Sequence, residues 1–297
     1  MKIGFFADGQ WALNTLKEIL KSNSLFVEFV ALRYSNPDDS IANFCTESGI
    51  DFFVFQNVNS DQSLKEIKTY NCDVFLSVSY DQIFGSKVLN IPNKFSINFH
   101  AGMLPFYRGR NVINWALING EKNIGLTVHY VDSGIDTGDI ILQEEIEVSL
   151  EDDYGSVLEK IYSRAPKLII KALEKASNKD FNPIKQKTID PYGFYFGKRE
   201  VGDENINWND TSFNIYNFIR ALSKPGPIAR TYIGRNIIKI HKAKFIKELR
   251  SYIGIPGQVI GINKSNLFVK TKDSFLIITK YEALQKIRVG DRLGEKS

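Results

Sequence analysis

The first hundred residues alternate between apolar runs of strand length and segments whose apolar residues recur with the period of a helix. The strand-length runs are almost continuously apolar, which is typical of parallel strands buried on both faces. We therefore predict a doubly wound α/β domain, with helices on both sides of a mostly parallel sheet. The expected strands are residues 3–7, 26–32, 52–55, 74–78 and 95–99, and the expected helices are residues 12–20, 41–48, 64–70 and a short one near residue 88.

Two further apolar runs, residues 125–131 and 140–148, are expected at the far edge of the same sheet. A long amphipathic helix over residues 154–176 follows, and then a polar stretch punctuated by proline and glycine. Short alternating runs separated by Gly, Asn and Asp turns predict a small β-barrel near the C-terminus. We expect a first domain over residues 1–178, a linker over residues 179–204 and a β-rich domain over residues 205–297.

The charge of the chain is a weak guide to its partners. The 38 Lys and Arg exceed the 34 Asp and Glu by four, and we interpret these side chains as spread along the chain without a basic stripe. We therefore expect no nucleic-acid partner. Two cysteines without metal-like spacing, no signal peptide and no run of ~20 apolar residues predict a cytoplasmic protein with no membrane segment and no metal.

Polar side chains cluster in residues 96–109, at the end of a predicted central strand. Ligands of open α/β sheets bind at such carboxyl ends. Asn98 and His100 are two residues apart, so on an extended strand both side chains project from one face and can reach one carbonyl group. Capping of loop backbone groups is the alternative for an isolated pair of this kind.

A second loop, residues 131–140, carries three carboxylates between glycines that allow close approach to a ligand. Asp136 stands at its apex, between Gly134 and Gly138, and is the candidate functional carboxylate. For Asp132 and Asp139 we favour turn capping.

From residue 98 to residue 140 the chain resembles the formyltransferase family that uses N10-formyltetrahydrofolate. The matching positions are Asn98, His100, Leu104, Pro105, Tyr107, Arg108, Gly109, Trp115, Ala116 and residues 132–139. The resemblance implies an enzyme whose Rossmann-like N-terminal domain binds folate and catalyses transfer, followed by a smaller OB-like domain. It also places Asn98, His100 and Asp136 on the family's catalytic positions. Ala101, Gly102 and Met103 depart from the common family pattern, which bears on pocket shape.

The chemistry of formyl transfer agrees with these roles. Charge develops on the formyl oxygen as an amine attacks, so Asn98 is the expected donor to that oxygen. His100 either takes the amine proton or donates to the oxyanion, and Asp136 orients it. The resemblance implies that the folate co-substrate contacts two loops and their surroundings, through Ser79, Tyr80, Asp81, Gln82, Ile83, Met103, Val131 and Asp132.

For the acceptor we predict a nucleotide-linked amino-dideoxysugar used in a bacterial surface glycan. Residues 33–39 are short and acidic, whereas the resemblance implies a basic insertion here in the tRNA enzymes of the family. Methionyl-tRNA is the alternative acceptor, and an inactive nucleic-acid-binding module is the alternative outside enzymes. A homodimer is compatible with the apolar C-terminal region.

The acceptor-binding residues are expected in two places. Two arginines beside a helix start suit a diphosphate, although a structural ion pair is the competing interpretation of Arg108. The first β-to-α turn offers backbone donors and an indole ring. The candidates are Gly9, Gln10, Trp11, Tyr107, Arg108, Arg110 and Asn111.

Overall fold

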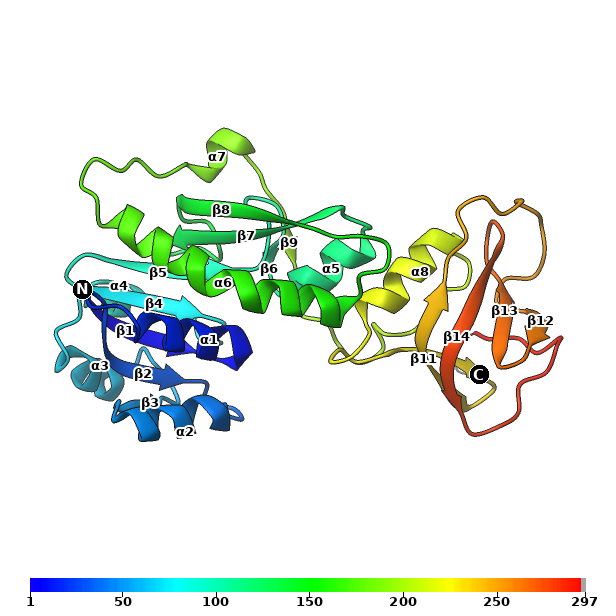
Figure 1. The fold of residues 1–297 in the computed structure, drawn as a ribbon, viewed down its shortest axis with the longest axis horizontal. Helices are drawn as coiled ribbons and strands as arrows, with labels where there is room; N and C mark the ends of the chain where they lie inside the picture. The colour runs from blue at the N-terminus through cyan, green and yellow to red at the C-terminus, as the bar shows by residue number, and fades with distance from the viewer. Residues whose placement is uncertain (295–297) are drawn as a thin grey trace. The chain divides into compact units, whose positions relative to one another are not determined.

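The computed structural model describes residues 1–294 (Figure 1). Contacts within the chain divide it into two compact units. The first unit comprises residues 1–109, 124–146 and 159–196, and the second comprises residues 110–123, 147–158 and 197 onward. The last three residues of the expected 205–297 domain lie outside the described residues.

The first unit is built on one seven-stranded sheet in the order β3-β2-β1-β4-β5-β7-β8. Strands β3, β2, β1, β4 and β5 pair in parallel, and β7 runs antiparallel to β5. The predicted mostly parallel sheet is therefore confirmed, with the two later runs at its edge. The strands are β1 (Lys2–Ala7), β2 (Phe26–Leu32), β3 (Phe52–Val54), β4 (Val74–Val78), β5 (Phe95–His100), β7 (Asn123–Tyr130) and β8 (Ile140–Glu147).

Helices cover both faces of this sheet. Phe5 and Phe6 are adjacent on β1 and point to opposite faces, yet neither is exposed. Phe6 packs with side chains of α3 and α4, whereas α1 lies beside α6, where Asn14 Nδ2 donates to the carbonyl of Tyr162 over 3.3 Å (Figure 1). The doubly wound prediction is thus confirmed. The helices are α1 (Gly9–Ile19), α2 (Asp39–Ser48), α3 (Asp61–Lys68), α4 (Ser86–Leu89) and α6 (Tyr154–Ala176).

The strand order reverses between β1 and β4. The chain leaves β1 for β2 and β3 on one side, then crosses to β4 and β5 on the other. At such a switch point the loops at the strand ends diverge, and open α/β sheets bind their ligands there. The loops that follow β1, β4 and β5 all lie at this edge and carry many of the predicted site residues, while Val131, Asp132 and Asp136 lie in the loop between β7 and β8.

The second unit contains an antiparallel sheet in the order β10-β11-β14-β13-β12. Residues 290–294 hydrogen-bond to both of its edges: Gly290 N donates to Val259 O over 2.8 Å, and Gly294 N donates to Tyr232 O over 3.0 Å. This segment joins the two edges, as the predicted barrel requires. The elements are α5 (Val112–Ile118), α8 (Ser212–Ala221), β10 (Ala229–Ile233), β11 (Asn236–Lys244), β12 (Val259–Asn263), β13 (Asn266–Lys270) and β14 (Phe275–Ala283).

The stretch expected as a linker contains regular structure within the first unit. Helix α7 (Gln186–Ile189) and strand β9 (Tyr195–Phe196) lie there, and β9 pairs in parallel with β6 (Arg108–Gly109). These elements are too short to produce a periodic apolar pattern, which is why the sequence does not reveal them.

Candidate active site

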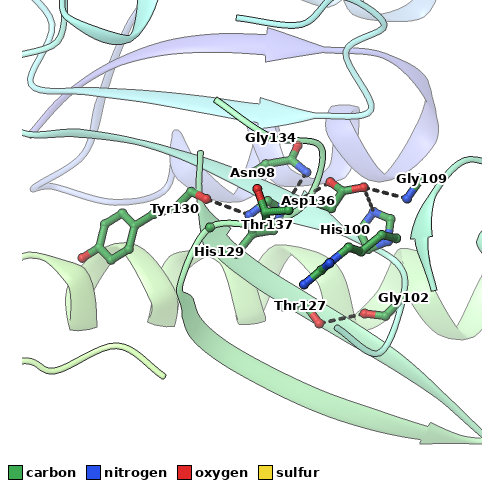
Figure 2. A network of polar contacts seen from close by, with 12 residues as sticks. Asn98, His100, Gly102, Gly109, Thr127, His129, Tyr130, Gly134, Asp136 and Thr137 are labelled. Carbon is green, nitrogen blue, oxygen red and sulfur yellow. Dashed lines mark hydrogen bonds and ion pairs between the residues drawn. The ribbon is translucent and has the colours of Figure 1, made fainter. Parts of the chain in front are cut away.

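Asn98 and His100 lie on the same face of β5, as their spacing predicts. The antiparallel neighbour β7 places His129 opposite Asn98 and Thr127 opposite His100. Asn98 Nδ2 is 3.2 Å from His129 Nε2 (Figure 2). The strand pair thus brings an amide and two imidazoles together.

His100 is only 8% exposed and is held by the loop that follows its strand. Its Nε2 is 2.7 Å from the carbonyl oxygen of Tyr107. Because a carbonyl oxygen can only accept, Nε2 carries the proton and Nδ1 of the neutral ring is an acceptor. Burial lowers the pKa of His100 below its ordinary value and outweighs the opposing effect of Asp136.

Asp136 meets both imidazoles from the separate loop between β7 and β8 (Figure 2). Its Oδ2 is 3.6 Å from His100 Nδ1, and its Oδ1 is 3.4 Å from His129 Nε2. Oδ2 also accepts a hydrogen bond of 2.9 Å from the backbone N–H of Gly109. Burial alone would raise the pKa of Asp136, but the positive charge that the facing imidazoles carry when protonated, together with this N–H, holds that pKa well below its ordinary value. Asp136 is therefore a carboxylate in the folded protein.

His129 is a site residue that the sequence argument misses. Considered alone, it occupies a strand-period run and reads as structural. In the structure it is 2% exposed, and its Nδ1 lies 2.8 Å from the carbonyl oxygen of Tyr130, so its Nε2 faces Asn98 and Asp136. Antiparallel pairing of β7 with β5 would have revealed it, because Asn98 and His129 are then direct cross-strand neighbours.

The loop after β4, predicted as the folate site, forms neither helix nor strand from Ser79 to Gly85. Its side chains hold it in place: Gln82 Nε2 donates to Phe55 O over 2.7 Å, and the Tyr80 ring packs on Phe6 at 5.3 Å between centroids. Ser79 has a positive φ of 62°, and Ile83 is 63% exposed.

Two of these loop side chains have polar atoms of note. The Tyr80 hydroxyl is buried and has no hydrogen-bond partner among residues 1–294. Asp81 Oδ2 lies 3.7 Å from Arg33 Nε. A buried hydroxyl without a partner suits a polar heterocycle, because such a ligand can supply the missing hydrogen bond.

The remaining folate candidates divide between backbone and capping roles. Met103 packs its backbone against Gly125, where an added Cβ would lie 2.5 Å from Met103 Cα. Val131 N donates to Ser96 O over 2.9 Å. Asp132 Oδ1 accepts from Gly134 N at 3.0 Å and Thr137 Oγ1 at 2.6 Å, which is the turn capping favoured from the sequence.

The first β-to-α turn lies beside the loop after β4. The Trp11 indole N–H donates to Ser79 Oγ, and its ring packs edge-on against Phe99 and Tyr162. Gly9 N donates to Asp38 Oδ2 over 3.2 Å, and Gln10 Nε2 donates to Asn14 Oδ1 over 2.8 Å. The indole is thus packed inside the first unit.

The run from Tyr107 to Asn111 divides between the two units. In the first, Tyr107 is buried with a φ of 55°, and the guanidinium of Arg108 donates to Gln186 Oε1 over 2.8 Å. In the second, Asn111 has a φ of 55° and its Oδ1 accepts from Arg199 N at 3.0 Å, while Arg110 is exposed. Arg108 therefore has protein partners of its own, although Gln186 is a neutral one.

Residues 1–294 contain neither a candidate membrane-spanning helix nor a candidate metal site. No helix in this part of the chain combines the length and apolar character needed to span a bilayer. Across the same residues, no three His, Cys, Asp or Glu side chains are arranged to hold a metal ion.

Comparison with known proteins identifies the family. Residues 1–173 match the model for "Formyl transferase", and residues 199–290 match "Formyl transferase, C-terminal domain". The chain belongs to the formyltransferase family. It is accordingly an enzyme of the formyltransferase class, as the motif in residues 98–140 predicts.

Curated relatives and solved structures extend the match along the chain. The methionyl-tRNA formyltransferase of Clostridium tetani is 31% identical over 295 residues, covering 95% of this chain and 92% of that protein. A sugar 3N-formyl transferase, solved with dTDP and 5-N-formyl-THF, superposes with a TM-score of 0.71 at 24% identity and covers 97% of this chain and 99% of its own. A methionyl-tRNA formyltransferase from Clostridium thermocellum gives 0.61 at 18% identity, with coverages of 96% and 99%. At these identities the two structures show the fold alone.

These relatives overturn two predictions. From the sequence we predict a nucleotide-linked amino sugar of a surface glycan as acceptor and no nucleic-acid partner, and both predictions are wrong. The curated relatives that match at 30–35% identity are methionyl-tRNA formyltransferases, including one from Fusobacterium nucleatum over 94% of the chain. The error lies in treating the short acidic segment 33–39 as decisive for the acceptor while treating the basic side chains as evenly spread.

Proposed function

We propose that the chain is a methionyl-tRNA formyltransferase, which moves the formyl group of N10-formyltetrahydrofolate to the amino group of methionine on its tRNA. The match to a curated enzyme of this kind over 95% of the chain carries the proposal. The convergence of Asn98, His100 and Asp136 supplies the chemical groups that the reaction requires.

The proposed site of the formyl donor is the loop after β4 together with Met103 and residues 131–132. Its support is the orphan hydroxyl of Tyr80 and a backbone that forms no helix or strand. The exposed Ile83 offers an apolar contact at the same loop. When bound there, the folate supplies the formyl carbon that the amine attacks.

The proton assignments favour one role for His100. Its Nε2–H is committed to Tyr107 O, so the neutral ring has only Nδ1 to offer, as an acceptor. We infer that Nδ1 takes the proton that the amine loses during attack. Asp136, 3.6 Å away, stabilises the imidazolium that results. This choice between base and oxyanion donor follows from the Tyr107 contact, which the sequence does not reveal.

Asn98 is the proposed donor to the formyl oxygen. Its amide nitrogen has two hydrogens, and the contact with His129 Nε2 uses one. The second can donate to the oxygen on which charge develops, and one such preorganised donor lowers a barrier by about 3 kcal/mol in comparable sites. His129 fixes the amide so that its nitrogen, and not its oxygen, faces the reacting group.

Support for a tRNA acceptor comes from the charge of the C-terminal residues. Residues 229–294 contain 14 Lys and Arg but only 4 Asp and Glu, so this part is strongly basic although the whole chain is only +4. Lys239, Lys242 and Lys244 are exposed on β11, and Lys242 pairs directly with Lys280 on β14. Like charges opposite each other destabilise a sheet, and a phosphate backbone relieves that repulsion.

The domains follow from this proposal. We retain residues 1–178 as the folate-binding catalytic domain, 179–204 as the connecting segment and 205–297 as the β-rich domain, which we now assign to contacts with tRNA. The family models at residues 1–173 and 199–290 support that division. Since charged tRNA is used in the cytoplasm, we place the enzyme there.

Acceptor competition tests the proposal. The purified enzyme is incubated with labelled N10-formyltetrahydrofolate and methionyl-tRNA, deacylated tRNA or free methionine, and label in the acceptor is measured. The proposal predicts transfer to methionyl-tRNA alone, at a rate that falls steeply with salt because phosphate contacts release counterions. Transfer that ignores the tRNA part, with free methionine as good an acceptor, would rule it out.

A further inference from the structure

Gln186 begins the short helix α7, in a stretch that the sequence presents as an unstructured connection. It is nonetheless only 3% exposed. A buried amide must find partners for its two hydrogens and its oxygen, since an unsatisfied one destabilises the fold. The partners that Gln186 finds connect it to the catalytic loop.

The Gln186 amide makes four hydrogen bonds. Nε2 donates to the carbonyl oxygens of Asp136 and Gly138, over 2.8 and 2.7 Å. Oε1 accepts from Arg108 Nε and Nη2, over 3.1 and 2.8 Å. Reversing the amide would set its oxygen against two carbonyls and its nitrogen against a guanidinium, so only the observed orientation satisfies every group.

Arg108 extends this connection to the other end of Asp136. Its neighbour Gly109 donates its backbone N–H to the Asp136 carboxylate at 2.9 Å, and Arg108 itself is fixed to the carbonyl of Tyr192 at 3.3 Å. Asp136 is thus held at its carboxylate by Gly109 and at its carbonyl by Gln186.

The backbone of Asp136 gives a reason for this restraint. Its φ of 54° lies in the left-handed region, which residues other than glycine adopt at a cost. Such conformations persist where the surroundings fix them, and they cluster at functional sites. A hydrogen bond to the Asp136 carbonyl opposes rotation of this peptide group.

We propose that Gln186, buttressed by Arg108, is a positioning residue that fixes the Asp136 loop so that the carboxylate faces His100 and His129. The inference rests on the proposed roles of His100 and Asp136. Gln186 touches no reacting atom and acts through Asp136 alone. Its loss removes two donors from the loop and leaves Nε and Nη2 of Arg108 without the oxygen that accepts from both.

Substitution of Gln186→Leu tests the assignment in the full-length enzyme, by steady-state transfer to methionyl-tRNA across pH 5–9. We expect kcat to fall about 10- to 100-fold, as for a displacement of about 1 Å at a catalytic group, with KM for both substrates within about twofold. The acidic limb of the rate profile should also move to lower pH, because His100 loses a carboxylate that raises its pKa.

Two further variants keep the result interpretable. Gln186→Glu retains the acceptors for Arg108 but faces both carbonyls with oxygen, so it should fold and still lose kcat. Lys187→Ala, exposed on the same helix, is the matched control and should be as active as the wild type. Gln186→Leu or Gln186→Glu with wild-type kcat per folded molecule, or with lost kcat but an unmoved acidic limb, overturns the inference. If instead His100→Asn and Asp136→Asn are active, it is the proposed catalysis that fails.

Discussion

The protonation state of three neighbouring side chains decides what the site can do. Asp136 is ionised and faces the acceptor nitrogens of His100 and His129, while both rings give their N–H to backbone carbonyls. A proton that enters this cluster therefore meets a carboxylate and two nitrogen lone pairs. In the proposed mechanism, this arrangement accepts the proton that an attacking amine must lose.

The pH dependence of the rate follows from His100. Its pKa is lowered by burial, so the neutral base is fully present above about pH 6.5 and is lost only as pH falls through the lowered value. We expect kcat/KM for methionyl-tRNA to be flat from pH 7 upward until other groups titrate, with an acidic limb below about 6.5. An acidic limb well above pH 7 would contradict this assignment.

His129→Leu tests whether His129 orients the Asn98 amide, because it leaves His100, the proposed base, in place. The change removes the acceptor of the Asn98 amide, 3.2 Å away, and one partner of Asp136. We expect kcat to fall about 10-fold or more, as loosening of an oxyanion donor does, with the enzyme still folded. Circular dichroism and single-turnover transfer are the measurements, and unchanged turnover would show that His129 has only a packing role.

The loop after β5 shows how the elements place these residues. A Cβ added at Gly102 would lie 2.6 Å from both His100 Nε2 and Tyr107 O. The hydrogen bond between His100 and Tyr107 therefore requires a residue without a side chain at position 102. Gly102 O also accepts from Thr127 Oγ1 of β7 at 2.7 Å (Figure 2). Glycine at this position, a departure from the family pattern, thus lets the loop close over His100.

Gly102→Ala should displace the imidazole or Tyr107, because contacts below 3.0 Å cannot be accommodated. We expect about a 100-fold loss of kcat with a stable fold. Gly197→Ala serves as the control, since an added Cβ there has no neighbour within 4 Å among the described residues. Equal kcat values for the two variants would show that the site accommodates the added Cβ at residue 102 without loss of activity.

At this scale the sequence predicts the elements well and their lateral contacts poorly. The five parallel strands and the paired spacing of Asn98 and His100 follow from apolar patterning and the period of a strand. His129 and Gln186 are not found this way: the first depends on the register of an antiparallel neighbour, and the second on a four-residue helix. Both signals are long-range, and no local pattern encodes them.

At the scale of the whole molecule, charge is distributed unequally between residues 229–294 and the rest of the chain. Positions 229–294 hold 14 basic and 4 acidic residues, and a net charge of only +4 for the whole chain hides this excess of ten. A prediction based on that total therefore misses the basic C-terminal residues. Regional charge, and not the sum, bears on whether a polyanion binds.

The double substitution Lys242→Glu with Lys280→Glu should weaken tRNA binding. It removes two exposed cations from paired positions of β11 and β14, so the affinity should fall and the slope of log K against log salt should decrease by about 1–2. Lys167→Glu is the control, because it makes the same Lys-to-Glu change at an exposed position on α6. Filter binding across 50–200 mM salt gives the affinity and the slope of log K against log salt. Equal slopes for the wild type, the double variant and the Lys167→Glu control would remove this surface from the proposed interface.

The most direct test of the account is formyl transfer to methionyl-tRNA by the wild type, His100→Asn and Asp136→Asn, with tRNA binding measured in parallel. We predict transfer by the wild type, and rates lower by at least about 1,000-fold in both variants at unchanged tRNA affinity. Wild-type rates in either variant, or no transfer by the wild type, would contradict it.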